Sequence, residues 1–125
     1  MLLRLKLYIL FPFSAFLIGC AYYNTFYNAE QYFEEAEKLR LEKDGGIIPI
    51  SAMDKYGKTI EKSNKVIKEF PDSRYVNDAR LLMSKARYYR SDYDLAIGDL
   101  KVIIKNGPNK IKEEANYWQA LCKWK

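Results

Sequence analysis

Two cysteines are the side chains of this 125-residue chain best suited to do chemistry. Cys20 lies near the start of the sequence and Cys122 near its end, and the chain has no histidine. The commonest general base and the commonest metal-binding side chain are therefore missing. Without a histidine to activate it, Cys122 is predicted to be a small buried apolar residue. Cys20 is left as the one residue with a predicted chemical role, and we expect no metal site.

Carboxylates are the next candidates, and they occur in the adjacent pairs Glu34-Glu35 and Glu113-Glu114. Neighbours on a helix diverge by about 100°, so such pairs are usually solvated and make poor acid–base dyads. Gly45-Gly46 ends a helical pattern instead of joining a strand to a helix, which argues against a phosphate-binding loop. We therefore expect no enzyme activity, no cofactor and no small-molecule substrate.

The first 19 residues have the three parts of a secretory signal peptide. Arg4 and Lys6 give a positive start, an apolar run covers residues 7–18, and small Gly19 precedes Cys20. The apolar run is too short for a permanent membrane-spanning helix, which needs about 20 residues. A plain signal peptide or an apolar helix with a chance cysteine is the alternative interpretation.

The four residues Leu17-Ile18-Gly19-Cys20 resemble the lipobox of bacterial lipoprotein precursors. The resemblance implies that diacylglycerol is joined to the Cys20 thiol, that the signal peptide 1–19 is removed, and that the mature domain spans 20–125. Acyl chains anchor a protein because each buried methylene contributes about 0.8 kcal/mol. Ala21 stands where the enteric-type sorting rule has Asp in proteins retained at the inner membrane. The resemblance thus implies an outer-membrane anchor with the domain facing the periplasm.

Charge is distributed along the whole chain, with 21 basic and 16 acidic residues and a formal net charge of +5. A protein that binds a polyanion usually carries a clustered basic patch. Basic and acidic residues that alternate along helices are typical of solvated helical faces. We therefore expect no nucleic-acid partner.

Apolar residues after Cys20 recur with the spacing of helices, and no stretch alternates over enough residues to require a strand. The spacing predicts an all-α domain with Met53 and Leu82 among the residues that face its core. Ser51 and Asp54 predict a capping box, and Asp72 or Ser73 is the expected cap of the next helix. Five helical stripes are predicted: 26–39, 53–70, 75–89, 93–104 and 111–125. Ser91-Asp92 forms a short turn between the third and the fourth, and Gly or Pro residues separate the others.

Two helix pairs repeat with an offset of 37 residues. The matched positions are Tyr56 with Tyr93, Ile60 with Ile97, Ile67 with Ile104, and Pro71 with Pro108. Asp92 to Ile97 resembles the opening of the second helix of a tetratricopeptide repeat, although Arg80 stands at the usual Trp position. The resemblance implies stacked antiparallel helix pairs in a TPR-like α-solenoid, about two and a half pairs long. A generic helical bundle is the alternative.

The junction Glu69-Phe70-Pro71-Asp72-Ser73, followed by Tyr75 and Ala79, resembles the repeat junction of the BamD-like outer-membrane lipoproteins. That family acts in the machinery that inserts β-barrels into the outer membrane. The resemblance implies a lipid-anchored scaffold that binds other envelope proteins. A repeat-lipoprotein subunit of another envelope process, such as cell-wall or polysaccharide export, is the alternative. Family members generally have more repeats, so we expect a truncated array or a partner that covers the last helix.

Aromatic and basic residues near the second repeat form the predicted partner-binding site. Arg87, Tyr88, Arg90 and Trp118 could stack on a bound segment and pair with its carboxylates. Packing between helices, with the tyrosine hydroxyls exposed, is the alternative role for these aromatic side chains.

Overall fold

The computed structural model describes residues 2–44 and 46–125, and it describes the side chains of residues 20–44 and 46–125. Within this part of the chain there are five helices and no strand, so the predicted all-α class is confirmed. The helices are α1 (Leu2–Leu41), α2 (Ile50–Glu69), α3 (Val76–Tyr89), α4 (Tyr93–Asn106) and α5 (Asn109–Trp124).

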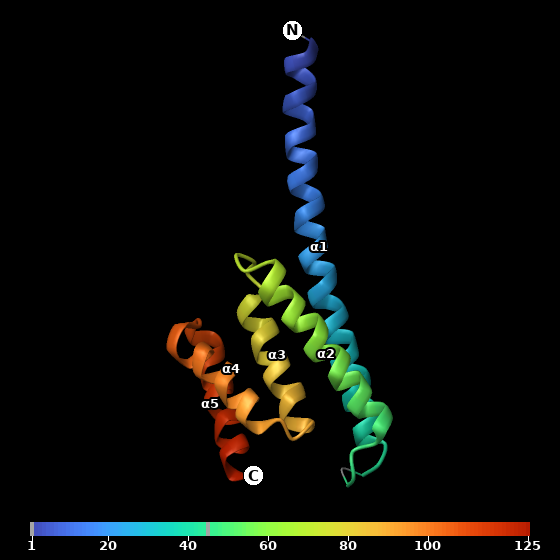
Figure 1. Ribbon diagram of the computed structural model, residues 1–125, viewed down its shortest axis with the longest axis vertical. Helices are drawn as coiled ribbons and strands as arrows, with labels where there is room; N and C mark the ends of the chain where they lie inside the picture. Colours follow the sequence, from blue (N-terminus) through green and yellow to red (C-terminus); the bar gives the residue numbers. More distant parts are fainter. Residues whose placement is uncertain (1, 45) are drawn as a thin grey trace.

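Each helix packs against the helix that follows it in the chain (Figure 1). Contacts between helices two apart occur only among the odd-numbered helices. Helix α1 also contacts α3, and α3 also contacts α5, whereas α2 and α4 do not touch. The helices α1, α3 and α5 therefore form one connected layer, with α2 and α4 packed against it.

Helix α1 is twice as long as any neighbour and its N-terminal half extends beyond the other four helices (Figure 1). Its backbone is helical through Cys20, across the predicted boundary of the signal peptide. The prediction of a signal peptide over residues 1–19 falls outside the residues whose side chains are described. In the described part of the chain, no helix has the length and apolar character needed to cross a membrane.

The buried faces of α2 and α4 repeat with the offset expected from the sequence. Thr59, Ser63 and Val66 are completely buried on α2, and the residues 37 positions later are completely buried on α4. These later residues are Ala96, Leu100 and Ile103. The two helices thus present the same register to the layer that they cover.

Small residues spaced by two helical turns recur on the other three helices. Ala29 and Ala36 of α1 are completely buried, as are Ala79 and Ala86 of α3. Ala115 and Cys122 of α5 are buried at the equivalent positions, 36 residues after those of α3. Residues seven apart lie on one face of a helix, so a small residue at each position lets a neighbouring backbone approach closely.

The predicted helix starts need two corrections. Helix α2 begins at Ile50 after Pro49, with no side-chain cap, so the capping box of Ser51 and Asp54 is wrong. Pro49 occupies the position just before the helix, where its fixed φ is tolerated and its missing N–H is not needed. Helix α3 begins at Val76 after Tyr75, with no side-chain cap, so the predicted cap at Asp72 or Ser73 is also wrong. Ser73 Oγ instead accepts a hydrogen bond of 3.1 Å from the Tyr75 N–H in the turn that precedes the helix.

Two predicted core positions are shifted by one residue. Ala52 is buried in place of Met53, and Leu81 is buried in place of Leu82, while both predicted residues are half-buried. Leu81 belongs to the apolar cluster that α3 shares with α4 and α5, whereas Leu82 packs against the cluster around Phe26. Helix α3 contacts neighbours on two sides, which a single apolar stripe does not describe.

Candidate interaction surface

Cys20 lies on the exposed surface of α1 as a free thiol. Two residues later, Tyr22 is in contact with the turn between α2 and α3, where its ring centroid lies 6.0 Å from Phe70 and 5.9 Å from Tyr75. The predicted attachment point is therefore accessible and directly adjoins the packed part of the domain.

An aromatic cluster runs across the layer of α1, α3 and α5. Tyr89 of α3 stacks on Tyr56 of α2 with ring centroids 5.0 Å apart, and Phe33 of α1 meets the edge of Tyr56 at 5.7 Å. Trp118 of α5 meets Tyr88 at 5.3 Å and Tyr89 at 5.9 Å. These rings connect three successive helices of the layer through direct contacts.

Cationic side chains lie over the rings of this cluster. The Arg40 guanidinium is 4.5 Å from the centroid of Tyr89. The Lys85 ammonium lies 5.4 Å from the Phe33 ring and 5.5 Å from the Trp118 ring. Contacts of this kind are worth about 0.5–1 kcal/mol at exposed sites and more where water is excluded.

Glu37 of α1 forms hydrogen bonds at the edge of the aromatic cluster. It accepts a short hydrogen bond from the Tyr56 hydroxyl and a bidentate pair from Arg40 at 2.7 and 3.2 Å. Burial, followed by the adjacent Glu37 carboxylate, raises the pKa of the Tyr56 hydroxyl far above its usual range. Tyr56 therefore stays a neutral donor, and its role at this site is to bond and not to exchange a proton.

Two hollows flank the cluster and differ in charge. One of about 190 Å³ is lined by Phe26, Glu30, Asp78, Lys85 and Glu114, between α1, α3 and α5. Burial and then the carboxylates of Glu34 and Asp78 raise the pKa of Glu30.

The other hollow has a volume of about 220 Å³ and lies beside Arg40, Tyr88, Tyr89, Tyr93 and Lys125. No acidic residue lines it. The hollow beside Glu30 is thus lined by more acids than bases, whereas the hollow beside Arg40 is lined by two bases, of which Arg40 is paired with Glu37.

Two of the predicted binding residues make contacts inside the domain. Arg87 of α3 forms a short ion pair with Asp99 of α4, and its side chain is largely buried. Arg90 donates a hydrogen bond of 2.7 Å to the Met53 carbonyl of α2 and lies 3.8 Å from Asp92. Partner binding by these arginines stays a prediction, while their contacts tie α3 to its two neighbours.

The other two predicted residues, Tyr88 and Trp118, lie together in the aromatic cluster and are half-buried. Lys85 and Arg40, which cover the rings beside them, were not singled out from the sequence. The spacing of Phe33, Glu37 and Arg40 carries a usable signal, since residues four and three apart share one face of a helix.

One glutamate of each acidic pair in the sequence forms an ion pair with a lysine of another helix. Glu35 forms an ion pair with Lys55 of α2, and Glu114 pairs with Lys85 of α3 at 3.0 Å. Cys122 is buried as predicted, and burial raises the pKa of its thiol. Among the residues described here, no group of carboxylates and cysteines is placed to hold a metal ion.

Comparison with known proteins gives no relative to set beside this geometry: no family model, no curated protein and no solved structure matches the chain.

Proposed function

We propose that this protein is a lipid-anchored scaffold of the bacterial cell envelope, built from stacked TPR-type helix pairs and acting by binding other proteins. The observation that carries the proposal is the repeated burial register. Small buried residues recur at Ala79 and Ala86 of α3 and 36 residues later on α5, and the α2 register recurs 37 residues later on α4. Stacked helix pairs of about 34 residues produce offsets of this size.

The layer formed by α1, α3 and α5 supplies the partner surface in this proposal. Tyr88, Tyr89 and Trp118 offer rigid rings, and Arg40 and Lys85, which are paired with Glu37 and Glu114 within the domain, hold neighbouring rings in place. Aromatic and arginine side chains dominate the energetics of protein interfaces. A partner segment with apolar or aromatic anchors fits this pattern best.

Anchoring follows from the lipobox resemblance and the exposed Cys20 thiol. Acyl chains on this residue would hold the surface beside a membrane and raise its effective concentration near envelope partners. Replacement by Cys20→Ser is expected to abolish metabolic palmitate labelling and to leave an uncleaved or released form. Labelling at the wild-type level would refute the anchor.

Site-specific photo-crosslinking tests the partner surface in cells. A photoreactive amino acid at Tyr117, which is 60% exposed on α5 beside Trp118, is expected to capture an envelope protein. The matched control is Leu95, which is 57% exposed on α4, away from that layer. Equal capture at both positions, or capture at Leu95 alone, would contradict the assigned surface.

The identity of the captured protein separates the two functional classes. A component of the barrel-insertion machinery would support the BamD-like role in outer-membrane protein assembly. A component of cell-wall or polysaccharide export would favour the alternative, with the same anchor and the same surface.

A further inference from the structure

We infer that the end of the domain nearest Cys20 lies in the headgroup layer of a phospholipid bilayer, held there by tyrosine rings and Arg74. The inference rests on the proposed attachment of acyl chains to Cys20. It goes beyond that proposal because it replaces a loosely tethered domain by one with a fixed contact face and a fixed orientation.

The first step is the absence of any break between the anchor and the domain. Cys20, Tyr22 and Phe26 belong to the same helix, α1, and Tyr22 already contacts the α2–α3 turn. Phe26 is buried and stacks on Tyr75 with centroids 4.9 Å apart. The helix therefore fixes the position of Cys20 relative to the packed part of the domain.

Acyl chains on Cys20 limit how far the tyrosines of α1 can lie from the apolar core of the bilayer. A helix rises about 1.5 Å per residue, which puts Tyr23 about 4.5 Å and Tyr27 about 10 Å from Cys20 along an upright axis. The polar layer on each side of a bilayer is about 5–8 Å thick, given an apolar core of about 30 Å within a total of 40–45 Å. An upright helix is the orientation that places these residues farthest from the apolar core. Acyl chains on Cys20 thus leave Tyr23 within the headgroups.

The third step is the side chains that surround this end. Tyr23 is 54% exposed and Tyr27 is 45% exposed, and their rings stack on one face of α1 with centroids 6.4 Å apart. Tyr22, Phe70 and Tyr75 continue the aromatic surface around the helix. Tyrosine is enriched at membrane interfaces because its ring is apolar and its hydroxyl is wet.

The α2–α3 turn carries an arginine that suits the phosphate of a lipid headgroup. Arg74 is exposed, lies 4.8 Å from the centroid of the Tyr75 ring, donates to its hydroxyl at 2.5 Å, and makes no ion pair with another described side chain. A hollow of about 360 Å³ opens between Tyr22, Phe70, Asp72 and Arg74. An arginine suits a phosphate, and Arg74 stands at the rim of this hollow.

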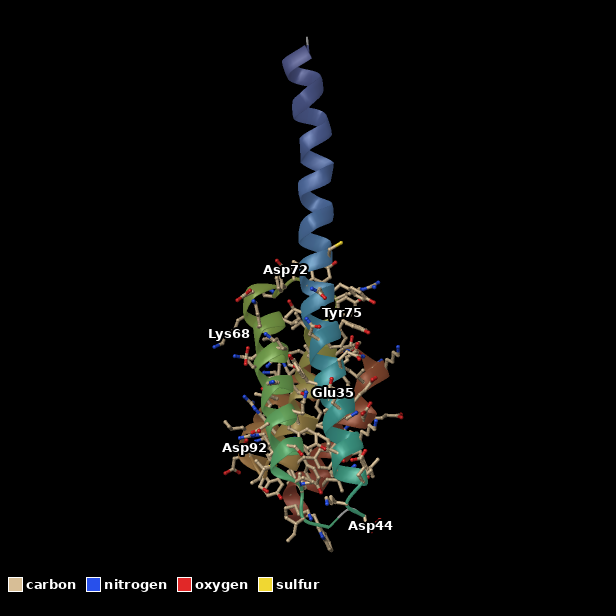
Figure 2. The ribbon with its side chains drawn as sticks, turned by 90° about the vertical axis from the view of Figure 1, so that its right-hand side faces the viewer. Glu35, Asp44, Lys68, Asp72, Tyr75 and Asp92 are labelled. Atoms are coloured by element: carbon tan, nitrogen blue, oxygen red, sulfur yellow. The ribbon has the colours of Figure 1, made fainter. Side chains whose placement is uncertain are left out.

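Net charge at this end favours a bilayer over a strongly charged partner. Residues 65–75 contain three bases and two acids, and Glu69 is paired with Lys65 at 3.9 Å. Figure 2 shows Asp72 and Tyr75 at the end from which the N-terminal part of α1 projects, and Asp44 at the opposite end. Only the first of these two ends combines exposed rings, an unpaired arginine and the anchor.

A polarity-sensitive fluorophore on an introduced cysteine tests the placement. Asp72→Cys reports on the α2–α3 turn, and Ile47→Cys is the matched control, because Ile47 is 93% exposed in the α1–α2 connection. Cys122 is buried and Cys20 is acylated in the proposed form, so the label reacts with the introduced thiol. The full acylated chain is placed in vesicles of phosphatidylethanolamine and phosphatidylglycerol, and the Cys20→Ser form in solution gives the aqueous reference.

A clear shift of the emission to shorter wavelength is expected at position 72 and none at position 47. Equal emission at the two positions would overturn the inference while leaving the anchor intact. An intact mass without acyl chains would instead overturn the anchor, so the two failures are distinguishable.

A second variant asks whether the side chains hold the end in place. Tyr23→Ser combined with Arg74→Ser, in the Asp72→Cys background, is expected to lose at least half of the shift while remaining bound through its acyl chains. A full shift in this variant would overturn the role assigned to Tyr23 and Arg74.

Discussion

The two helix pairs of this domain are held together by different chemistry. Around Tyr56, helices α1, α2 and α3 meet through aromatic rings and alanines, with one glutamate bonded at the edge. Between α3 and α4, a buried apolar cluster is joined by Asp99, which pairs with Arg87 and lies 3.5 Å from Arg80. The same small-residue register can thus be stabilised by stacking at one seam and by an ion network at the next.

The difference has a physical reason in the residue at the helix crossing. The tetratricopeptide resemblance puts Arg80 at a usual Trp position, and its buried Nε atom has no hydrogen-bond partner among the described residues. A buried guanidinium is costly unless a carboxylate accompanies it. Asp99 supplies that carboxylate on the facing helix, and Arg87, two turns from Arg80 on α3, supplies a second cation.

Removal of the Tyr56 ring is expected to give the largest loss of stability. Tyr56→Ala leaves a cavity where Tyr89 and Phe33 now pack, at a typical cost of about 3–5 kcal/mol. Urea unfolding of the purified domain measures it. Tyr56→Phe keeps the ring and removes only the bond to the Glu37 carboxylate, so its cost should be smaller, about 1.5–3 kcal/mol. Equal losses in the two variants would show that the bond and not the ring stabilises this seam.

Removal of the Asp99 carboxylate is expected to cost about 3 kcal/mol, because it strands two largely buried arginines. Urea unfolding of Asp99→Ala, compared with the parent chain, gives the value. The informative control is the triple change Arg80→Met, Arg87→Met and Asp99→Leu, which replaces the network by apolar groups and should recover most of the loss. A triple variant as unstable as Asp99→Ala would contradict the desolvation argument.

Overpacking of the small-residue register should have an intermediate effect. Ala96→Trp is expected to destabilise the domain by about 1–3 kcal/mol, because Ala96 is completely buried where α4 meets the apolar cluster. Leu95→Trp is the matched control. Leu95 is next to Ala96 in the sequence and is exposed, so this substitution should change the stability by less than about 0.5 kcal/mol. An unchanged melting temperature in Ala96→Trp would contradict the close packing of α4 at Ala96.

The sequence predicted the helices and the offset of 37 residues because apolar spacing and Gly or Pro stops are local signals. It could not predict that Arg80 and Arg87 share Asp99, since that contact joins residues on two helices whose rotation relative to each other is set by packing. The same limit explains why Leu82 was chosen in place of Leu81. The choice depends on α5, which packs on a second side of α3.

The aromatic cluster was only partly predictable for a related reason. Tyr88 and Trp118 were chosen as binding residues from their type, and the structure brings them together. Lys85 and Arg40 cover the rings from α3 and α1, and only the packing of these two helices makes them neighbours of Tyr89 and Trp118.

The smallest expected effect concerns Glu30, a carboxylate that forms no ion pair with a described side chain. Burial raises the pKa of both Glu30 and Asp99. Two arginines reduce the increase at Asp99, whereas the carboxylates of Glu34 and Asp78 raise the pKa of Glu30 further. A carboxyl whose pKa is raised in the folded state binds its proton more tightly than in the unfolded chain. The ionised form of Glu30 therefore lowers stability above the raised pKa, and the penalty disappears as the pH falls below the ordinary value of 4.5.

Glu30→Gln mimics the neutral form, so it is expected to raise the melting temperature slightly at pH 7 and to lose that advantage near pH 4. Thermal unfolding followed by circular dichroism at the two pH values measures the difference. Glu113→Gln is the control, because Glu113 is exposed and makes no ion pair with a described side chain. A gain for Glu30→Gln that persists at low pH would have to come from packing, and would contradict the charge repulsion assigned to this hollow.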